Sequence, residues 1–175
     1  MVLILITGSS ASGKSTLSSI VSKMEKCVII PQDSFYSHDF VQFPYTRDMD
    51  DSMERPEKIN WARLMDLVEK NIDINTNVIV EGHIVLTYEP LVKMADYIFF
   101  IQRPKDQCER RFMERGSEGL TSEQNDIKRD YFNNVTWPSH SKYVEEYAKP
   151  LAMDDRFFKL PGIKSSANMI TSILR

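Results

Sequence analysis

Residues 2–24 read VLILITGSSASGKSTLSSIVSKM, and this stretch decides the fold. Its first part, residues 2–7, is a continuous apolar run, which is typical of a strand buried on both faces of a sheet. A loop of small residues follows over residues 8–15, and residues 16–24 have the pattern of a helix. A buried strand that passes through such a loop directly into a helix predicts the first unit of an α/β fold.

The loop from Gly8 to Ser15 satisfies the motif G-x-x-x-x-G-K-[ST], in the strand-and-helix context that the motif requires. Gly8 and Gly13 permit the backbone geometry that points successive N–H groups at phosphate oxygens, beside the positive end of a helix. Lys14 is expected to reach the terminal phosphates, and the Ser15 hydroxyl to ligate Mg²⁺. We therefore predict that a nucleoside triphosphate contacts Gly8, Ser10, Ala11, Ser12, Gly13, Lys14, Ser15 and Thr16.

The rest of the chain alternates short apolar strands with helices. Strands are predicted at residues 28–30, 78–80, 97–101 and 157–160. Helices are predicted at residues 61–71, 90–94, 103–115, 122–147 with an interruption at Trp137-Pro138, and from Ser165 or Ser166 to 174. Residues 38–56 are interpreted as an irregular excursion. This order predicts a parallel sheet flanked by helices on both faces, a three-layer α/β fold of the P-loop NTPase type in a single domain over residues 1–175.

Composition narrows the class of protein. Of the 175 residues, 42% are hydrophobic and 27% charged, which is typical of a globular domain and excludes a disordered tail or a disulfide scaffold. With 22 basic and 25 acidic residues the formal net charge is −3, so no nucleic-acid partner is expected. No apolar window has the length of a membrane span, and the apolar start is too short for a signal peptide. Cys27 and Cys108 are expected to be reduced thiols, so we expect a cytoplasmic protein. Either a monomer or a homodimer is expected.

Two acidic residues fall where predicted strands end, which is the edge at which parallel sheets place ligands. Asp33 follows the second strand and is placed to accept a proton from an attacking hydroxyl group. The alternative is an aspartate that only starts a turn after Pro31. Glu81 ends the third strand, where a carboxylate holds Mg²⁺ directly or through water.

A cluster of arginines follows the fourth predicted strand. Arg111 and Arg115 share one face of the predicted helix, and Arg110 lies next to them. Because phosphoryl transfer is catalysed by positioning and charge neutralisation, we expect these arginines to close over the phosphates on a lid at about residues 110–130. Gly116 and Gly119 would give this lid its mobility. The alternative is a charge-rich, solvated helix.

The class of P-loop protein follows by exclusion. The guanine-reading motif N-K-x-D of a GTPase does not occur, and motor or transport ATPases are usually much larger, which leaves a small-molecule or nucleotide kinase. The phosphate loop, residues 32–36 (QDSFY), residues 80–82 (VEG) and the arginines together resemble the uridine kinase group of nucleoside kinases. The segment 131–138 (YFNNVTWP), with Lys142-Tyr143 and the spaced Pro56, Ile59 and Trp61, is more similar to nicotinamide riboside kinases.

This resemblance implies transfer of the ATP γ-phosphoryl group to the 5′-hydroxyl of a riboside, with ATP and Mg²⁺ as cofactors. The family roles are general base, phosphate and Mg²⁺ binding, a second Mg²⁺ or substrate carboxylate, and a lid that also reaches the ribose. By this resemblance, Asp33 matches the general base, and Lys14 and Ser15 match the groups that bind phosphate and Mg²⁺. Glu81 matches the second carboxylate. The lid is matched by Arg110, Arg111 and Arg115, of which Arg111 would reach the ribose. The leading interpretation is phosphorylation of nicotinamide riboside to nicotinamide mononucleotide, a step of NAD biosynthesis. The alternatives are a kinase of uridine, cytidine or another small metabolite, and a nucleotide-binding regulatory module without catalysis.

The sequence departs from the family pattern shortly before Pro56. The aromatic–Asp pair of the family, whose Asp binds ribose hydroxyls, is replaced by Met53-Glu54. Glu54 is predicted to take the ribose role, with Asp51 as the second candidate. Aromatic walls of the acceptor pocket are predicted from Phe35, Tyr36, Tyr45 and Tyr131.

The three histidines share no spacing. His83 directly follows Glu81-Gly82, a position from which it can line the pocket, whereas His38 and His140 are expected on the surface. The adenine pocket is assigned to residues 160–167 from chain order alone.

Overall fold

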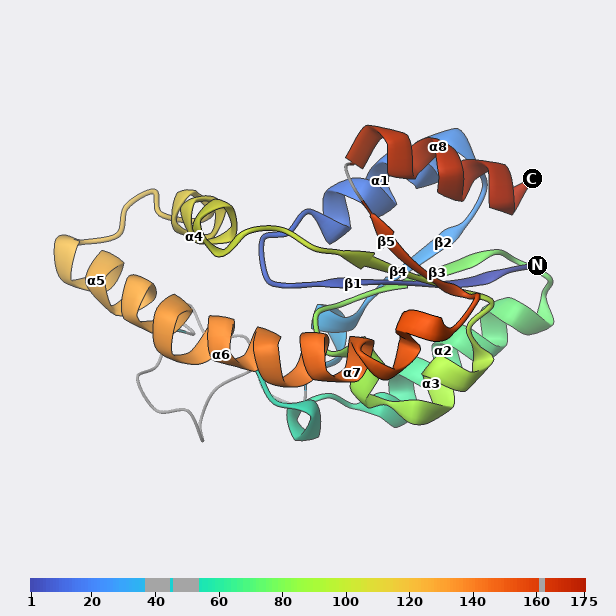
Figure 1. The fold of residues 1–175 in the computed structure, drawn as a ribbon, viewed down its shortest axis with the longest axis horizontal. Helices are drawn as coiled ribbons and strands as arrows, with labels where there is room; N and C mark the ends of the chain where they lie inside the picture. The colour runs from blue at the N-terminus through green and yellow to red at the C-terminus, as the bar shows by residue number, and fades with distance from the viewer. Residues whose placement is uncertain (37–44, 46–53, 161–162) are drawn as a thin grey trace.

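The computed structural model describes residues 1–36, 45, 54–160 and 163–175, and it centres on a parallel sheet. The strands are β1 (Leu3–Gly8), β2 (Val28–Pro31), β3 (Val78–Glu81), β4 (Tyr97–Ile101) and β5 (Phe157–Leu160). They pair in parallel in the order β2-β3-β1-β4-β5, so that β1 lies at the centre (Figure 1). In register, Glu81 lies beside Pro31 on one side and Ile6 on the other. The carboxyl ends of the three strands therefore meet at one edge of the sheet.

Helices cover both faces of the sheet, which confirms the predicted three-layer P-loop NTPase fold. Successive residues of β1 point to opposite faces, so Ile4 and Ile6 pack under α1 (Lys14–Met24) and α8 (Ile163–Leu174). Leu3 and Leu5 pack in a separate cluster with residues of α2 (Trp61–Asp73) and α3 (Glu89–Met94). Asn60 caps the start of α2, because its side chain accepts a hydrogen bond from the backbone N–H of Arg63 at 3.0 Å.

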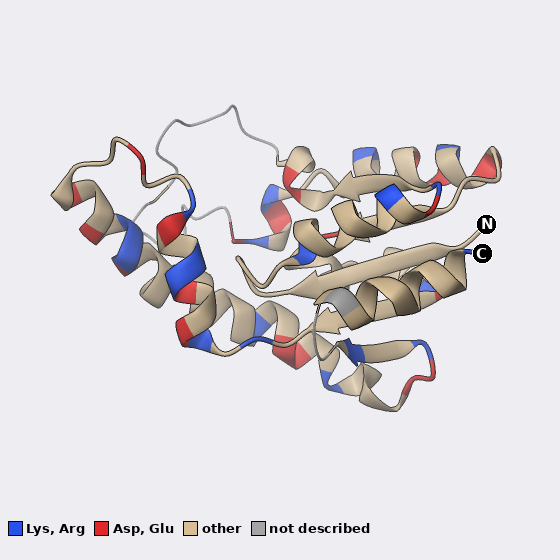
Figure 2. Cartoon of the chain, turned by 90° about the horizontal axis from the view of Figure 1, so that it is seen from above, with Lys and Arg blue, Asp and Glu red and all other residues tan. Residues whose placement is uncertain are grey.

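An arm made of α4 (Lys105–Glu114) and α5 (Ser122–Tyr131) extends beyond the sheet, and α5 leads into a helical run back across it (Figure 1). This run comprises a π-helical turn (Phe132–Thr136), α6 (Trp137–His140), a second π-helical turn (Ser141–Glu145) and α7 (Glu146–Ala148). The expected interruption at Trp137-Pro138 is thus a widened turn and not a break. Figure 2 shows acidic and basic residues interspersed along the arm, as expected for solvated helix faces.

The helical run places His140 differently from the prediction. Its side chain is 3% exposed, and its ring lies 4.9 Å from that of Trp137 and 6.4 Å from that of Phe100 on β4. The expected surface position is wrong, because the run continues through Pro138 and turns this residue toward the sheet. Burial lowers the pKa of His140 to about 4.

Short 3₁₀ turns complete the described part of the chain. They are η1 (Gln32–Phe35), η2 (Pro56–Lys58), η3 (Val85–Thr87) and η6 (Pro150–Met153). None of the helices within the described ranges is long and apolar enough to cross a membrane.

Candidate active site

The phosphate loop joins the end of β1 to the start of α1, as predicted. Gly8 has φ 149° and Gly13 has φ 109°, conformations that favour glycine. A Cβ atom at Gly8 would lie 2.6 Å from the Ile101 carbonyl oxygen, and one at Gly13 would lie 2.9 Å from Ile163 Cδ1. The backbone angles favour glycine at both positions, and at Gly8 the close approach of the Ile101 backbone also requires it.

Lys14 lies inside the curve of this loop. Its Nζ donates hydrogen bonds to the carbonyl oxygens of Gly8 at 3.1 Å and Ser9 at 2.9 Å. Desolvation lowers the pKa of Lys14, and the nearby charges of Glu81 and Asp33 offset part of that effect. The ammonium group is thus held where the loop surrounds it, with carboxylates on the open side.

Ser15 and Glu81 are brought together from α1 and β3. The Ser15 hydroxyl donates a hydrogen bond to Glu81 Oε1 at 2.7 Å. Hydroxyl and carboxylate oxygens are donors that Mg²⁺ prefers, and Mg²⁺ commonly takes only one or two protein ligands beside phosphate and water. The pair therefore fits a magnesium ion, although the described residues contain no cluster of three His, Cys, Asp or Glu side chains that could hold a metal.

A cavity of about 460 Å³ adjoins the loop and collects most of the predicted groups. It is lined by loop residues and Asp33 of η1, by Glu81 at the end of β3 and His83 after it, and by the α4 region. The α4 residues are Arg111 and Glu114, and Arg115 follows directly after the helix. The Arg111 guanidinium lies against Gly13. The cavity therefore collects a lysine, two arginines and three carboxylates, the third being Glu114.

Arg110 is placed on another face of α4. Its side chain is 71% exposed and its Nε lies 4.0 Å from Glu114 Oε1. It lines a shallow surface depression outside the arm together with Asn125 and Arg129. The structure does not bring Arg110 to the phosphate loop.

The residues predicted for the acceptor side have unequal positions. Phe35 is 5% exposed and packs in the core, with the Arg63 guanidinium 5.9 Å from its ring. Burial raises the pKa of Tyr36, and the nearby charges of Glu54 and Asp33 act in the same direction. Tyr45 packs against Tyr131 with ring centroids 5.4 Å apart.

Three of the residues named for the acceptor side or the surface, His38, Asp51 and Met53, lie outside the described residues.

Glu54 is buried in a polar cluster. Its Oε1 accepts hydrogen bonds from Thr136 Oγ1 at 3.0 Å and Tyr131 Oη at 3.4 Å. Its Oε2 lies 2.7 Å from His83 Nε2. Burial by itself would raise the pKa of Glu54, but His83, Thr136 and the charge of Lys14 outweigh it and hold the pKa below its ordinary value. The carboxylate is therefore ionised and surrounded by protein donors.

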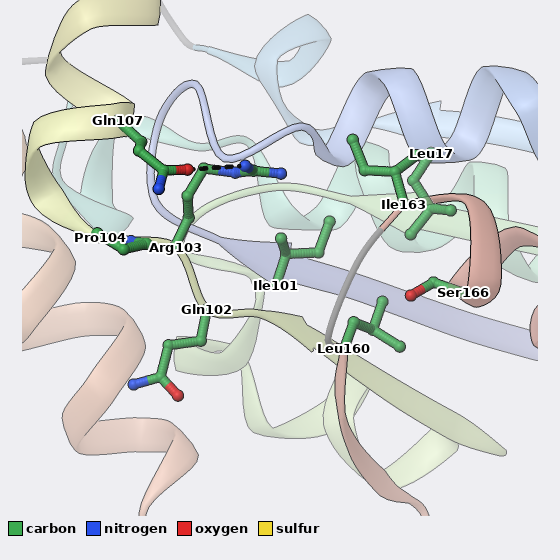
Figure 3. A pocket seen from close by; sticks show the side chains of 9 residues that line it. All are labelled: Leu17, Ile101, Gln102, Arg103, Pro104, Gln107, Leu160, Ile163 and Ser166. Carbon is green, nitrogen blue, oxygen red and sulfur yellow. Dashed lines mark hydrogen bonds between the residues drawn. The ribbon is translucent and has the colours of Figure 1, made fainter.

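A second cavity of about 200 Å³ lies next to the loop, and sequence reasoning missed the contribution of Arg103 to it (Figure 3). Arg103 forms one side, where its Nε donates a hydrogen bond to the Ser12 carbonyl oxygen at 2.9 Å and its Nη1 to Gln107 Oε1 at 3.1 Å. Apolar side chains from α1, β4, β5 and α8 form the other walls: Leu17, Ile101, Leu160 and Ile163. The position of Arg103 directly after a strand was the available signal. Leu160, Ile163 and Ser166 fall within the segment predicted for adenine, of which residues 161–162 lie outside the described ranges.

Comparison with known proteins places this site in a family. The model of the AAA domain family matches residues 4–131. The chain belongs to this family. Its P-loop fold and its kinase relatives make it a phosphotransferase with an alcohol group as acceptor.

Two curated relatives and one solved structure illustrate the likeness. The chain is 24% identical to human nicotinamide riboside kinase 1 over 169 residues, which cover 82% of this chain and 77% of that protein. It is 30% identical to uridine kinase of Haemophilus influenzae over 148 residues, covering 67% and 69% respectively. The structure of deoxyadenosine kinase from M. mycoides with bound dATP has a TM-score of 0.58 at 17% identity and covers 98% of both chains. This last comparison supports the fold.

Proposed function

We propose that this AAA-family chain is an ATP- and Mg²⁺-dependent nucleoside kinase that phosphorylates the 5′-hydroxyl of a riboside. Nicotinamide riboside is the first candidate acceptor, with nicotinamide mononucleotide as product, which would place the reaction in NAD biosynthesis. The observation that carries the proposal is the cavity in which Lys14, the Ser15–Glu81 pair, Asp33 and Arg111 meet. In this proposal residues 1–175 act as one cytoplasmic kinase domain, monomeric or homodimeric, with a lid at about residues 110–130.

Each group in the cavity has a role that its chemistry fits. Lys14 neutralises charge on the β- and γ-phosphates, and Arg111 and Arg115 neutralise charge on the transferred group. A magnesium ion would be held by Ser15 and Glu81, and it supplies charge neutralisation and orientation of the phosphates. Asp33 accepts the proton of the attacking hydroxyl.

The adenine of ATP is assigned to the second cavity. A planar guanidinium from Arg103 on one side and apolar side chains on the other suit a flat aromatic base. The Arg103 contact with the Ser12 carbonyl ties this cavity to the phosphate loop, so base and phosphates would be positioned together. The contact of Arg110 with the nucleotide stays a prediction, and it would require movement of the arm.

A uridine or cytidine kinase is the second candidate function. The uridine kinase relative favours it, and the replacement of the aromatic–Asp pair by Met53-Glu54 leaves the identity of the base open. The two candidates share the Asp33 chemistry and differ in the acceptor. A silent regulatory module would bind ATP and turn over no acceptor.

The experiment is ADP release with Mg·ATP over a panel of nicotinamide riboside, uridine, cytidine and a no-acceptor control. Phosphorylation of nicotinamide riboside at the 5′ position, with a higher kcat/KM than for the pyrimidine ribosides, supports the first candidate. Preference for uridine or cytidine supports the second. ATP binding without turnover of any riboside would contradict the proposed kinase.

A further inference from the structure

His83 and Glu54 form a buried polar pair that the proposed chemistry leaves without a role. The side chains of both residues are 8% exposed, and Glu54 Oε2 lies 2.7 Å from His83 Nε2. His83 lies two residues after Glu81 and lines the cavity that also holds Lys14 and Asp33. Burial of a carboxylate and a histidine at the wall of this cavity costs desolvation free energy. A role of these two side chains in binding would account for that cost.

The Glu54 carboxylate is enclosed by protein groups. One carboxylate oxygen accepts from Tyr131 at the end of α5 and from Thr136 in the π-helical turn that follows, and the other faces His83. Oε1 has two hydroxyl donors, and Oε2 is buried with the His83 ring 2.7 Å away, so neither oxygen is open to a sugar hydroxyl. Its position fits a group that orients the imidazole of His83.

The other ring nitrogen of His83 is then the one available to a ligand. Within the described part of the chain no hydrogen bond reaches His83 Nδ1, whereas Nε2 faces the carboxylate. With Nε2 turned toward the Glu54 carboxylate, Nδ1 accepts a hydrogen bond when the ring is neutral and donates one when the ring is protonated. A hydroxyl group is a partner for both forms, since it donates and accepts.

We propose that His83 binds a hydroxyl group of the sugar of the acceptor through Nδ1, and that Glu54 is a positioning residue that holds the ring for this contact. The inference rests on the proposed function and deepens it, because it names the part of the acceptor that this wall of the cavity recognises. It also moves the sugar-binding role from Glu54, where the sequence placed it, to His83.

Two substitutions of His83 separate the two ring nitrogens. The amide of asparagine occupies the place of Nδ1, and the longer glutamine places its amide near Nε2. We expect His83→Asn to keep an acceptor KM close to that of the wild type and His83→Gln to raise it about tenfold, the worth of a hydrogen bond of about 1.4 kcal/mol. The KM for ATP and the melting temperature should be alike in both variants. An acceptor KM for His83→Gln equal to or below that for His83→Asn would overturn the proposal.

Analogues of the acceptor identify the hydroxyl. For the wild type, the 2′-deoxy or the 3′-deoxy form of the best riboside should show kcat/KM lowered by about tenfold. In His83→Gln the same deoxy form should lose no further activity, because the partner of that hydroxyl is already missing. Equal losses in wild type and variant for both analogues would show that His83 does not contact the sugar.

The role of Glu54 is tested through its coupling to His83. Glu54→Gln keeps an oxygen for Thr136 and Tyr131 but turns an amide N–H group toward His83 Nε2. We expect a raised acceptor KM, and a double variant with His83→Gln that is no worse than His83→Gln alone. A wild-type KM in Glu54→Gln, or losses that add in the double variant, would contradict the positioning role.

The outcomes for the two proposals are distinct. A wild-type protein that binds ATP but phosphorylates no riboside refutes the proposed function, and this inference with it. A wild-type protein that phosphorylates a riboside, with a KM that does not separate the two His83 variants, refutes the inference alone.

Discussion

Lys128 on α5 holds the two helices of the arm together, and replacing it with methionine tests whether this arm positions the arginines. The whole residue is buried, and its Nζ donates to the Met113 carbonyl oxygen at 3.2 Å, the Arg115 carbonyl oxygen at 2.5 Å and the Ser117 hydroxyl at 3.0 Å. The two carbonyls lie at the carboxyl end of α4, where helical carbonyl groups lack partners within the helix. The lysine therefore caps the helix that carries Arg111 and Arg115.

The cost of Lys128→Met follows from these contacts. Methionine keeps most of the apolar stem, so the main loss is of a charged donor shared by three acceptors. Hydrogen bonds to charged groups are worth about 1.5–3 kcal/mol each. Part of this loss is offset, because the variant no longer buries an ammonium group whose pKa is lowered by desolvation. We expect a net loss of about 2–3 kcal/mol. For a chain of this size that corresponds to a fall in melting temperature of about 5–10 °C.

Thermal unfolding and steady-state kinetics together check this prediction. Besides the lower melting temperature, kcat should fall about tenfold or more, because Arg111 and Arg115 lose their fixed position. The matched control is Lys70→Met on α2, where an exposed lysine contacts Asp66 at 2.7 Å, and it should change stability by less than about 0.5 kcal/mol. If Lys128→Met melted and turned over like the control, the arm would not depend on this lysine and the reasoning would be refuted.

Three further changes probe the turn after β3, the buried histidine and the second cavity. A Cβ at Gly82 would lie 2.4 Å from Gln32 Oε1, so Gly82→Ala should cost about 1–3 kcal/mol in urea unfolding, and an unchanged midpoint would contradict this packing. Because burial lowers the pKa of His140 to about 4, the unfolded chain binds more protons between pH 6.5 and that value, and stability falls as the pH falls through this range. His140→Phe should flatten that slope in unfolding experiments at about pH 7 and 4.5; an equal slope would show that other groups cause it. Arg103→Ala should raise the KM for ATP about tenfold and leave that for the acceptor unchanged, while equal effects on both would remove Arg103 from the base cavity.

Asp33 provides the direct test of the chemistry. Asp33→Asn should leave ATP binding near the wild-type level and lower kcat by about 10²-fold, whereas the matched surface change Asp66→Asn should do neither. Unchanged turnover in Asp33→Asn would remove the residue from the role of general base.

The phosphate loop and the two strand-end carboxylates could be predicted because their positions follow from local rules. A parallel sheet brings the carboxyl ends of its strands to one edge, and the register places Pro31, just before Asp33 in the chain, beside Glu81. The helical repeat also predicted that Arg111 and Arg115 share a face. The repeat did not indicate which face of α4 meets the loop. For that reason the sequence could not predict that Arg110 lies away from the cavity.

The rest of the site depends on contacts between distant parts of the chain. Glu54 meets Tyr131 and Thr136, which lie 77 and 82 residues further along the sequence. His140 becomes buried because π-helical turns change the face that the helical run presents, and no local pattern marks such a turn. The place of Arg103 in the second cavity depends on the phosphate loop and α8 packing beside it, which the local sequence does not indicate.

Lys14 and Ser15 of the phosphate site make hydrogen bonds within the protein, and this bears on what can bind there. Lys14 donates to two loop carbonyls, and Ser15 donates to Glu81. A ligand must replace these bonds with ones at least as strong, which charged phosphate oxygens do and a neutral hydroxyl does not. Asp33, by contrast, is exposed, and no side-chain hydrogen bond to it occurs within the described ranges. The carboxylate that would take a proton from the acceptor therefore gives up no described hydrogen bond, whereas the lysine and the serine must exchange theirs. This division of the cavity favours loading of the polyphosphate by exchange and of the acceptor by simple addition beside it.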